Sequence, residues 1–94
     1  MSGDRILVVE DDPSVRIVLS ELLERTGYRV DTAADGAEAL ALSKNISFQL
    51  HLIDYELPGM NGIDLMREIK RVHSNAVCIL LTGFGTIELS VKAM

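Results

Sequence analysis

Three acidic residues of this chain directly follow short apolar segments. Glu10 and Asp11 follow the apolar run 6–9, and Asp54 follows the apolar segment 48–53. If these segments are neighbouring parallel strands, the carboxylates converge, and two of them about 4 Å apart repel by roughly 4 kcal/mol at an effective dielectric of 20. Either one carboxyl group takes up a proton or a divalent cation binds. We favour Mg²⁺, because it prefers oxygen ligands and retains bound waters.

A cation beside Asp54 would neutralise an incoming phosphoryl group and orient it towards a carboxylate oxygen. In that chemistry Asp54 is the nucleophile. Thr82 follows another apolar segment, and its hydroxyl can hydrogen-bond to the transferred group. Asp12 directly precedes Pro13, so we expect it to cap a helix and leave it out of the site.

The elements that must position these residues alternate between strands and helices. Apolar runs and alternating segments predict strands over 6–9, 28–33, 48–53 and 77–81. Apolar residues at helical spacing predict helices from Pro13 to about Arg25, over 37–45, over 65–72, and from about 87 onward. Such alternation favours an α/β fold with a doubly wound, open parallel sheet. Ligands of these sheets bind beyond the carboxyl ends of the strands, where the acidic residues lie.

Composition limits the remaining possibilities. The 94 residues, 48% of them hydrophobic, are enough for one modest core, so we expect a single domain over 1–94. A net charge of −5 without a basic patch argues against direct nucleic-acid binding. No apolar run approaches the roughly 20 residues that span a membrane, and no leader is evident at the start. The single Cys78 cannot form an internal disulfide, which fits a cytoplasmic location.

The sequence resembles the receiver domain of bacterial two-component response regulators. Segment 6–16 is similar to the family's first strand and acidic pair. Segment 52–62 carries the most specific resemblance, with Asp54 at the phosphoacceptor position followed by the family's Leu-Pro-Gly-Met-x-Gly loop. Segment 81–88 is similar to receivers of enhancer-binding transcription activators. The resemblance implies a flavodoxin-like fold.

The same resemblance implies a set of roles and partners. Asp11 and Asp54 would bind Mg²⁺ directly, Glu10 would act through water, and the backbone carbonyl of Glu56 would complete the protein ligands. Thr82 takes the position of the switch hydroxyl. The implied phosphodonor is a sensor histidine kinase or a phosphotransfer protein. Phosphorylation of Asp54 would switch the conformation and regulate an output, which we expect to be transcription.

The resemblance covers four of the family's five strand–helix units, so we expect a receiver domain that is incomplete at its C-terminus. The fifth strand normally brings a lysine to the acyl phosphate, and Lys44, Lys70 and Lys92 all fall in predicted helices. Strand 77–81 would be left as an apolar edge, open to homodimerisation by strand addition or exchange of elements. His51 is a second departure, because its strand position is usually aliphatic in the family.

Two other functions remain open beside the phosphorylation switch. A phosphohydrolase with an aspartate nucleophile commonly has a second aspartate two residues later as general acid, and Glu56 occupies that position. A non-switching interaction or dimerisation fragment would bind metal without responding to phosphorylation. Steady phosphomonoester turnover would identify the first, and metal-dependent association without phosphorylation the second. We expect a phosphoacceptor, not a turnover enzyme.

Overall fold

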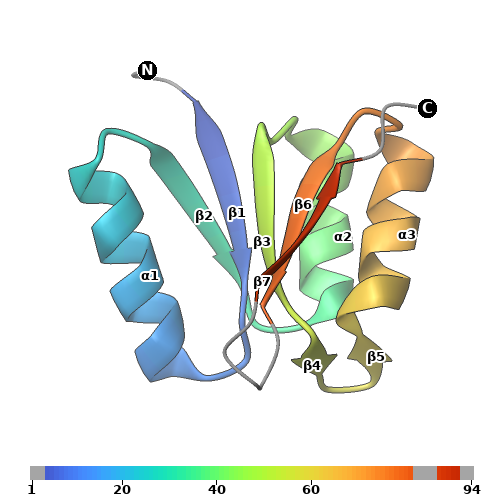
Figure 1. The fold of residues 1–94 in the computed structure, drawn as a ribbon, viewed down its shortest axis with the longest axis horizontal. Coiled ribbons are helices and arrows are strands. Elements are labelled where there is room, and N and C mark those ends of the chain that lie inside the picture. Colours follow the sequence, from blue (N-terminus) through green and yellow to red (C-terminus); the bar gives the residue numbers. More distant parts are fainter. Residues whose placement is uncertain (1–3, 82–86, 92–94) are drawn as a thin grey trace.

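A computed structural model describes residues 4–81 and 87–91 of the chain. The main sheet has the strand order β2-β1-β3-β6-β7 (Figure 1). Its strands are β1 (Arg5–Val9), β2 (Arg29–Ala33), β3 (Leu50–Asp54), β6 (Val77–Leu81) and β7 (Ile87–Val91). The helices are α1 (Pro13–Arg25), α2 (Gly36–Asn45) and α3 (Gly62–Val72). A small antiparallel pair, β4 (Glu56–Leu57) and β5 (Met60–Asn61), connects β3 to α3.

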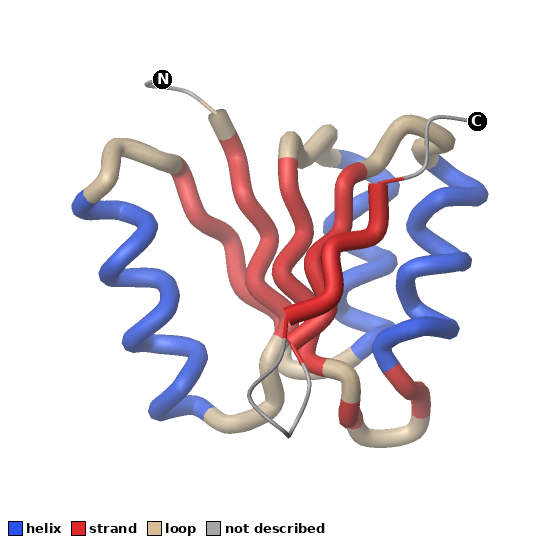
Figure 2. Tube along the Cα trace, in the orientation of Figure 1, coloured by secondary structure: helices blue, strands red, loops and turns tan. Residues whose placement is uncertain are grey.

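The parallel part of the sheet confirms the predicted doubly wound fold. Strand β1 pairs in parallel with β2 on one side and with β3 on the other, and β3 pairs in parallel with β6. Helix α1 lies on one face, whereas α2 and α3 pack side by side on the opposite face (Figure 2). The chain therefore changes direction along the sheet between β1 and β3, which makes the crevice beyond these two strands the expected ligand site.

The helix predicted from about residue 87 is wrong. The structure has strand β7 there, antiparallel to β6, with Leu81 opposite Ile87 and Val77 opposite Val91. The segment Ile-Glu-Leu-Ser-Val alternates between apolar and polar residues, a pattern that fits a strand as well as a short helix. Backbone hydrogen bonds to the apolar β6 edge favour the strand, because short helices nucleate poorly.

Strand β7 also corrects the expectation of an open β6 edge. The edge of β6 is paired within the chain, so the sheet is mixed and its outer strands are β2 and β7. A strand of a second molecule therefore cannot add to β6, because the backbone groups that it would pair with already bond to β7.

The ends of α1 agree with the sequence. Asp12 caps the helix, because its Oδ1 accepts a hydrogen bond from the Ser14 backbone N–H at 2.9 Å, and Pro13 takes the first helical position. After the helix, Gly27 adopts a positive φ of 106°, a conformation that glycine reaches at little cost.

The hydrophobic core is concentrated between the sheet and the pair α2–α3. Its buried members are Leu7, Val9, Ala33, Ala39, Phe48, Ile53, Leu57, Leu65, Ile69, Ala76, Cys78 and Leu80. Helix α1 contributes no buried residue, and its Ile17, Val18 and Leu22 are each more than half exposed, at 57%, 56% and 54%. The two faces of the sheet are therefore covered very unequally.

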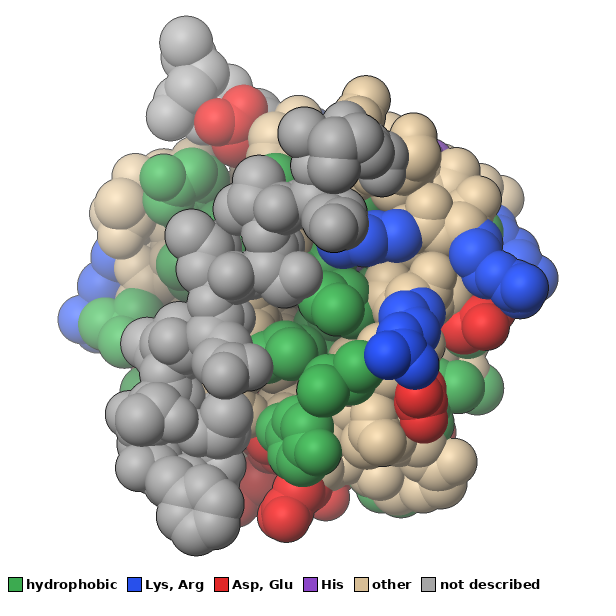
Figure 3. Space-filling model, turned by 45° about the vertical axis from the view of Figure 1, so that its right-hand side comes forward, with side chains coloured by type: hydrophobic (Ala, Val, Ile, Leu, Met, Phe, Trp, Pro, Cys, Tyr) green, Lys and Arg blue, Asp and Glu red, His purple; other side chains and the backbone are tan. Residues whose placement is uncertain are grey.

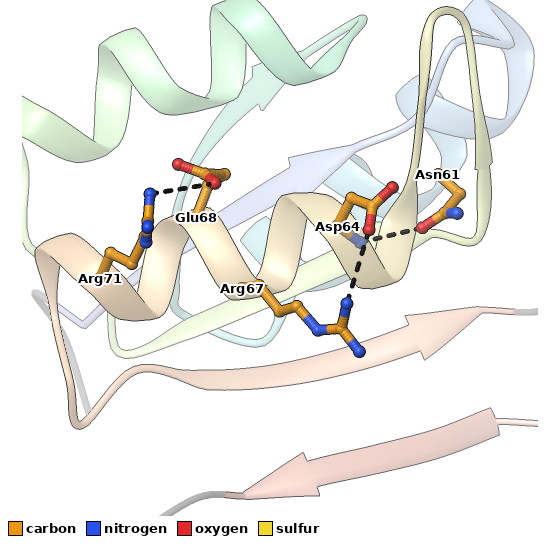
Figure 4. Close-up of polar contacts among 5 residues, drawn as sticks. All are labelled: Asn61, Asp64, Arg67, Glu68 and Arg71. Atoms are coloured by element: carbon orange, nitrogen blue, oxygen red, sulfur yellow. Dashed lines mark hydrogen bonds and ion pairs between the residues drawn. The ribbon is translucent and has the colours of Figure 1, made fainter.

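The outer side of α3 carries opposite charges next to one another. Arg67 lies 3.8 Å from Asp64, and Arg71 lies 3.5 Å from Glu68 (Figure 4). On the face shown in Figure 3, basic side chains lie beside acidic ones. Such exposed pairs add little to stability, but they leave no basic patch on the visible described surface of this face. Among the described residues, none of the helices has the length and apolar character needed to cross a membrane.

His51 is buried in β3 with only one of its ring nitrogens bonded. The side chain is 1% exposed, Nδ1 lies 3.2 Å from the Val77 carbonyl oxygen, and the ring meets Phe48 edge-on at 5.6 Å between centroids. In the described part of the chain, Nε2 has no hydrogen-bond partner. Burial lowers the pKa of His51 from its ordinary value of 6.5, partly opposed by the contact with Val77. The imidazole is therefore neutral at physiological pH.

Replacing His51 with Leu should stabilise the fold by about 1 kcal/mol, because removing the buried Nε2 that lacks a partner outweighs the loss of the long, 3.2 Å contact between Nδ1 and the Val77 carbonyl. The folded pKa is depressed, so acid favours the unfolded chain, and the advantage of Leu should grow as pH falls through the unfolded pKa of 6.5. Urea denaturation at about pH 7 and pH 5 measures both effects. His73→Leu is the matched control, because it removes the 2.7 Å contact from Nε2 to the Ser43 carbonyl and should destabilise. A loss of stability in His51→Leu would contradict the expectation.

Candidate functional site

The predicted convergence of carboxylates at the carboxyl ends of β1 and β3 is confirmed. Glu10, Asp11 and Asp54 each offer a carboxylate oxygen, and these atoms all lie within 4.8 Å of one another. They meet because β1 and β3 are adjacent, with Val9 opposite Ile53. Glu10 and Asp11 follow β1 and Asp54 ends β3, so parallel pairing brings all three to the same edge of the sheet.

Glu10 is the most firmly held of the three. Glu10 is only 7% exposed, and its backbone N–H donates a 3.0 Å hydrogen bond to the carbonyl oxygen of Ala33 at the end of β2. Its Oε2 accepts a hydrogen bond from the Asp12 backbone N–H at 3.0 Å, and its carbonyl oxygen accepts one from Arg16 Nη1 at 2.8 Å. Glu10 is thus fixed to both β2 and α1.

Asp54 is half-buried, and the following loop folds back against it. Its Oδ1 accepts a hydrogen bond from the Glu56 backbone N–H at 3.3 Å. The Gly62 backbone N–H donates to the Tyr55 carbonyl at 2.6 Å, and a Cβ placed on Gly62 would lie 2.7 Å from the Asp54 carbonyl oxygen. Asn61 caps α3 through a 2.9 Å hydrogen bond from the Asp64 N–H, which fixes the end of this loop (Figure 4).

Burial and crowding make the cluster electrostatically unfavourable when all three groups are ionised. The pKa of Glu10 is raised from 4.5 to about 7, chiefly by burial, with repulsion from Asp54 and hydrogen bonding to Asp11 and Asp54 adding to the rise. The hydrogen bond from the Asp12 N–H partly opposes it. Near neutral pH the cluster can therefore be relieved by a proton on Glu10 or by a cation.

The donor set fits Mg²⁺. All three groups are carboxylates, and their exposure increases from the buried Glu10 through Asp54 to the exposed Asp11. Mg²⁺ prefers a few carboxylate oxygens and keeps several waters, for which the exposed position of Asp11 leaves room. When bound, the ion would supply positive charge beside Asp54. Glu10, Asp11 and Asp54 are the residues that would hold it.

Glu56 is the other predicted site residue that lies beside the acidic cluster. Glu56 begins β4 beside Asp54, with its N–H on the Asp54 carboxylate. Thr82 lies outside the described residues; its chain neighbour Leu81 is paired with Asp54 in the sheet. Lys44 and Lys70 lie in the last turns of helices α2 and α3, as predicted, whereas Lys92 lies outside the described residues.

Arg16 and Gly62 support the site but were not predicted from the sequence. Arg16 lies one turn into α1. Its position shortly after the acidic pair and the helix cap could have indicated that its side chain reaches back to the Glu10 backbone. Gly62 was recognised only as the last residue of the Leu-Pro-Gly-Met-x-Gly loop. Its approach to the Asp54 backbone depends on how the β4–β5 loop folds, which the sequence does not reveal.

The raised pKa of Glu10 predicts that Mg²⁺ binding tightens with pH, by up to about tenfold per unit below the pKa of about 7, because binding must displace a proton. The folded pKa lies above the unfolded value of 4.5, so the metal-free chain should lose stability as pH rises through this interval. Calorimetric titration with Mg²⁺ at about pH 6 and pH 8 measures the first effect. Glu10→Gln keeps the shape and should remove most of the pH dependence. Equal pH dependence in both proteins would contradict this assignment.

Comparison with known proteins agrees with the geometry. The sequence matches the family described as response regulator receiver domain over residues 6–94. Sporulation initiation phosphotransferase F of Bacillus subtilis is 33% identical over 89 residues, which cover 95% of this chain and 72% of that protein. Transcriptional regulatory protein CpxR of Klebsiella pneumoniae is 41% identical over 83 residues, covering 88% of this chain but only 35% of the regulator.

Solved structures of a response regulator are also similar to this chain. The response regulator TrrA of Thermotoga maritima, in complex with Mg²⁺–BeF, superposes with a TM-score of 0.80 at 42% identity, covering 84% of this chain and 69% of TrrA. TrrA in complex with the histidine kinase ThkA superposes with a TM-score of 0.82 at 40% identity, covering 88% of this chain and 72% of the TrrA chain. The family match over residues 6–94 includes Glu10, Asp11 and Asp54.

Proposed function

Because this chain belongs to the family of response regulator receiver domains, we propose that it accepts a phosphoryl group on Asp54 in a Mg²⁺-dependent reaction. The observation that carries the proposal is the approach of Glu10, Asp11 and Asp54 to within 4.8 Å at the point where the strand order reverses. A carboxylate nucleophile beside a cation site is the arrangement that phosphoryl transfer to an aspartate requires.

In the proposed transfer, a carboxylate oxygen of Asp54 attacks the phosphorus atom while the bond from phosphorus to the donor breaks. Asp11 and Asp54 would hold the cation directly, Glu10 would act through water, and the Glu56 carbonyl would complete the protein ligands. The hydrogen bond from the Glu56 N–H to Asp54 Oδ1 supports this role, because it orients the carboxylate at the mouth of the crevice. It also keeps Glu56 next to the proposed ion.

Thr82 is proposed as the residue that registers the phosphoryl group. Support comes from its place in the chain, because Thr82 directly follows Leu81. Leu81 lies opposite Asp54 in the sheet, and its carbonyl oxygen accepts a hydrogen bond from the Tyr55 N–H at 2.8 Å. A hydroxyl at this position can hydrogen-bond to a phosphoryl oxygen on the neighbouring strand. The new bond would then bias the conformation of the segment that follows β6.

A histidine kinase is the proposed phosphodonor, with a phosphotransfer protein as the related possibility. The complex of TrrA with ThkA supports this choice, because the similarity to TrrA covers 88% of the present chain. The proposed output is transcription, supported by the similarity to CpxR, which is named a transcriptional regulatory protein. We place residues 1–94 in one receiver domain in the cytoplasm, and the net charge of −5 argues against direct nucleic-acid contact.

The proposal predicts a single stoichiometric phosphorylation without turnover. Incubation with Mg²⁺ and acetyl phosphate, followed by intact-mass measurement, should show the gain of one phosphoryl group, and chelation of Mg²⁺ should prevent it. Incubation with p-nitrophenyl phosphate should give no steady release of nitrophenol. No mass gain would contradict the phosphoacceptor assignment, whereas steady release would establish the phosphohydrolase alternative.

A further inference from the structure

Arg16 connects α1 to the peptide that precedes Asp11. Its Nη1 donates a 2.8 Å hydrogen bond to the Glu10 carbonyl oxygen, across six positions in the sequence. Only residues 10–12 separate β1 from α1, so this bond ties the helix to the start of the whole connecting loop. Arg16 is half-buried, which makes the bond stronger than a similar contact in open water.

The other bonds of this loop hold Glu10 and Asp12. The Glu10 N–H donates to Ala33, the Asp12 N–H donates to Glu10 Oε2, and Asp12 Oδ1 accepts the Ser14 N–H. Asp11 itself is exposed, so apart from its contact with the Glu10 carboxyl group its direction depends on the peptides on either side of it. The Arg16 guanidinium fixes the first of these peptides, because it binds the carbonyl oxygen between Glu10 and Asp11.

We infer that Arg16 is a positioning residue of the cation site, which holds the Glu10–Asp11 peptide so that the Asp11 carboxylate points to the position of the ion. This inference rests on the proposed Mg²⁺-dependent function. Arg16 would not touch the cation or the phosphoryl group. It would act through the backbone, in the manner of outer residues that orient metal ligands.

Because Arg16 is charged, the direction in which its substitution changes Mg²⁺ affinity tests the inference. A fixed positive charge close to a cation site repels the cation, so removing the charge alone would tighten Mg²⁺ binding. Removing a positioning hydrogen bond would loosen it. The two effects oppose each other, and the direction of the change in Mg²⁺ affinity shows which one dominates.

The experiment is calorimetric titration of Mg²⁺ into the full chain carrying Arg16→Gln or Arg16→Lys, with no phosphodonor present. We expect Arg16→Gln to weaken Mg²⁺ binding by about tenfold, the lower end of the range for outer residues of metal sites. Arg16→Lys keeps the charge and one donor, so it should recover part of the affinity. Arg25→Gln removes a charge from the last turn of the same helix and should leave the affinity unchanged.

Each outcome decides the inference. Unchanged or tighter Mg²⁺ binding in Arg16→Gln would overturn it and leave the proposed function standing, provided that the unsubstituted chain binds Mg²⁺. Failure of the unsubstituted chain to bind Mg²⁺ would overturn both. If Arg16→Gln does not fold, as judged by circular dichroism, Arg16→Lys decides: weaker binding than in the unsubstituted chain supports the inference, and equal binding contradicts it.

Discussion

Asp54→Asn is expected to abolish phosphoryl uptake from acetyl phosphate while leaving the fold intact. The amide has nearly the same shape as the carboxylate, but it is a poor nucleophile and would leave the cation with less negative charge. Asp11→Asn keeps the nucleophile and should slow uptake by about 10² through weaker Mg²⁺ binding. Intact-mass time courses at saturating acetyl phosphate measure both.

Asp12→Asn is the matched control for these two substitutions. It removes an adjacent carboxylate, yet asparagine caps helices about as well as aspartate. Within the described part of the chain, Asp12 contacts the acidic cluster through its backbone N–H, which the substitution keeps. Uptake should therefore be nearly unchanged. Persistent phosphorylation of Asp54→Asn would mean that Asp54 is not the acceptor, and an equal loss in Asp12→Asn would mean that the loss is not specific to Asp54.

Gly62→Ala should both destabilise the protein and disturb the acceptor. The added Cβ would lie 2.7 Å from the Asp54 carbonyl oxygen and 2.9 Å from the Tyr55 Cα, and neither backbone atom can move aside cheaply. We expect a loss of about 3 kcal/mol in the free energy of unfolding, which exceeds the gain of about 1 kcal/mol in helix propensity. Urea denaturation measures the loss, and the uptake rate of the folded fraction measures displacement of Asp54.

Gly59→Ala separates crowding from backbone strain. Gly59 has a positive φ of 76°, but a Cβ there would meet nothing within 4 Å. Its substitution should cost only about 1–2 kcal/mol of local strain and leave phosphoryl uptake nearly unchanged. If Gly62→Ala proved no more costly than Gly59→Ala, the close approach at Gly62 would not constrain the Asp54 strand.

The sequence predicted the parallel part of the fold because its signals are local and agree with one another. Strands such as 6–9 and 77–81 are short apolar runs, and Asp12-Pro13 marks the start of a helix. The position of the carboxylates followed from that topology, since the carboxyl ends of adjacent parallel strands meet. The acidic cluster is therefore the part of the site that sequence reasoning reached.

The rest depends on which segments meet in space. Segment 87–91 alternates in a way that suits a strand, and only the apolar edge of β6 decides between strand and helix. The raised pKa of Glu10 requires knowledge of its burial, because an acidic residue after a strand is normally exposed. The hydrogen bond of Arg16 and the crowding at Gly62 likewise arise from backbone approaches that no local pattern encodes.

The unequal packing of the sheet should divide the molecule into parts that open independently. Helix α1 contains no buried residue, whereas α2 and α3 enclose the core, so the amide hydrogens of α1 should exchange with solvent by local opening long before those of α3. The loop with Glu10 and Asp11 leads directly into the first residue of this helix, Pro13. A cation bound there would therefore slow exchange in α1 first, which makes this helix the natural reporter of an occupied site.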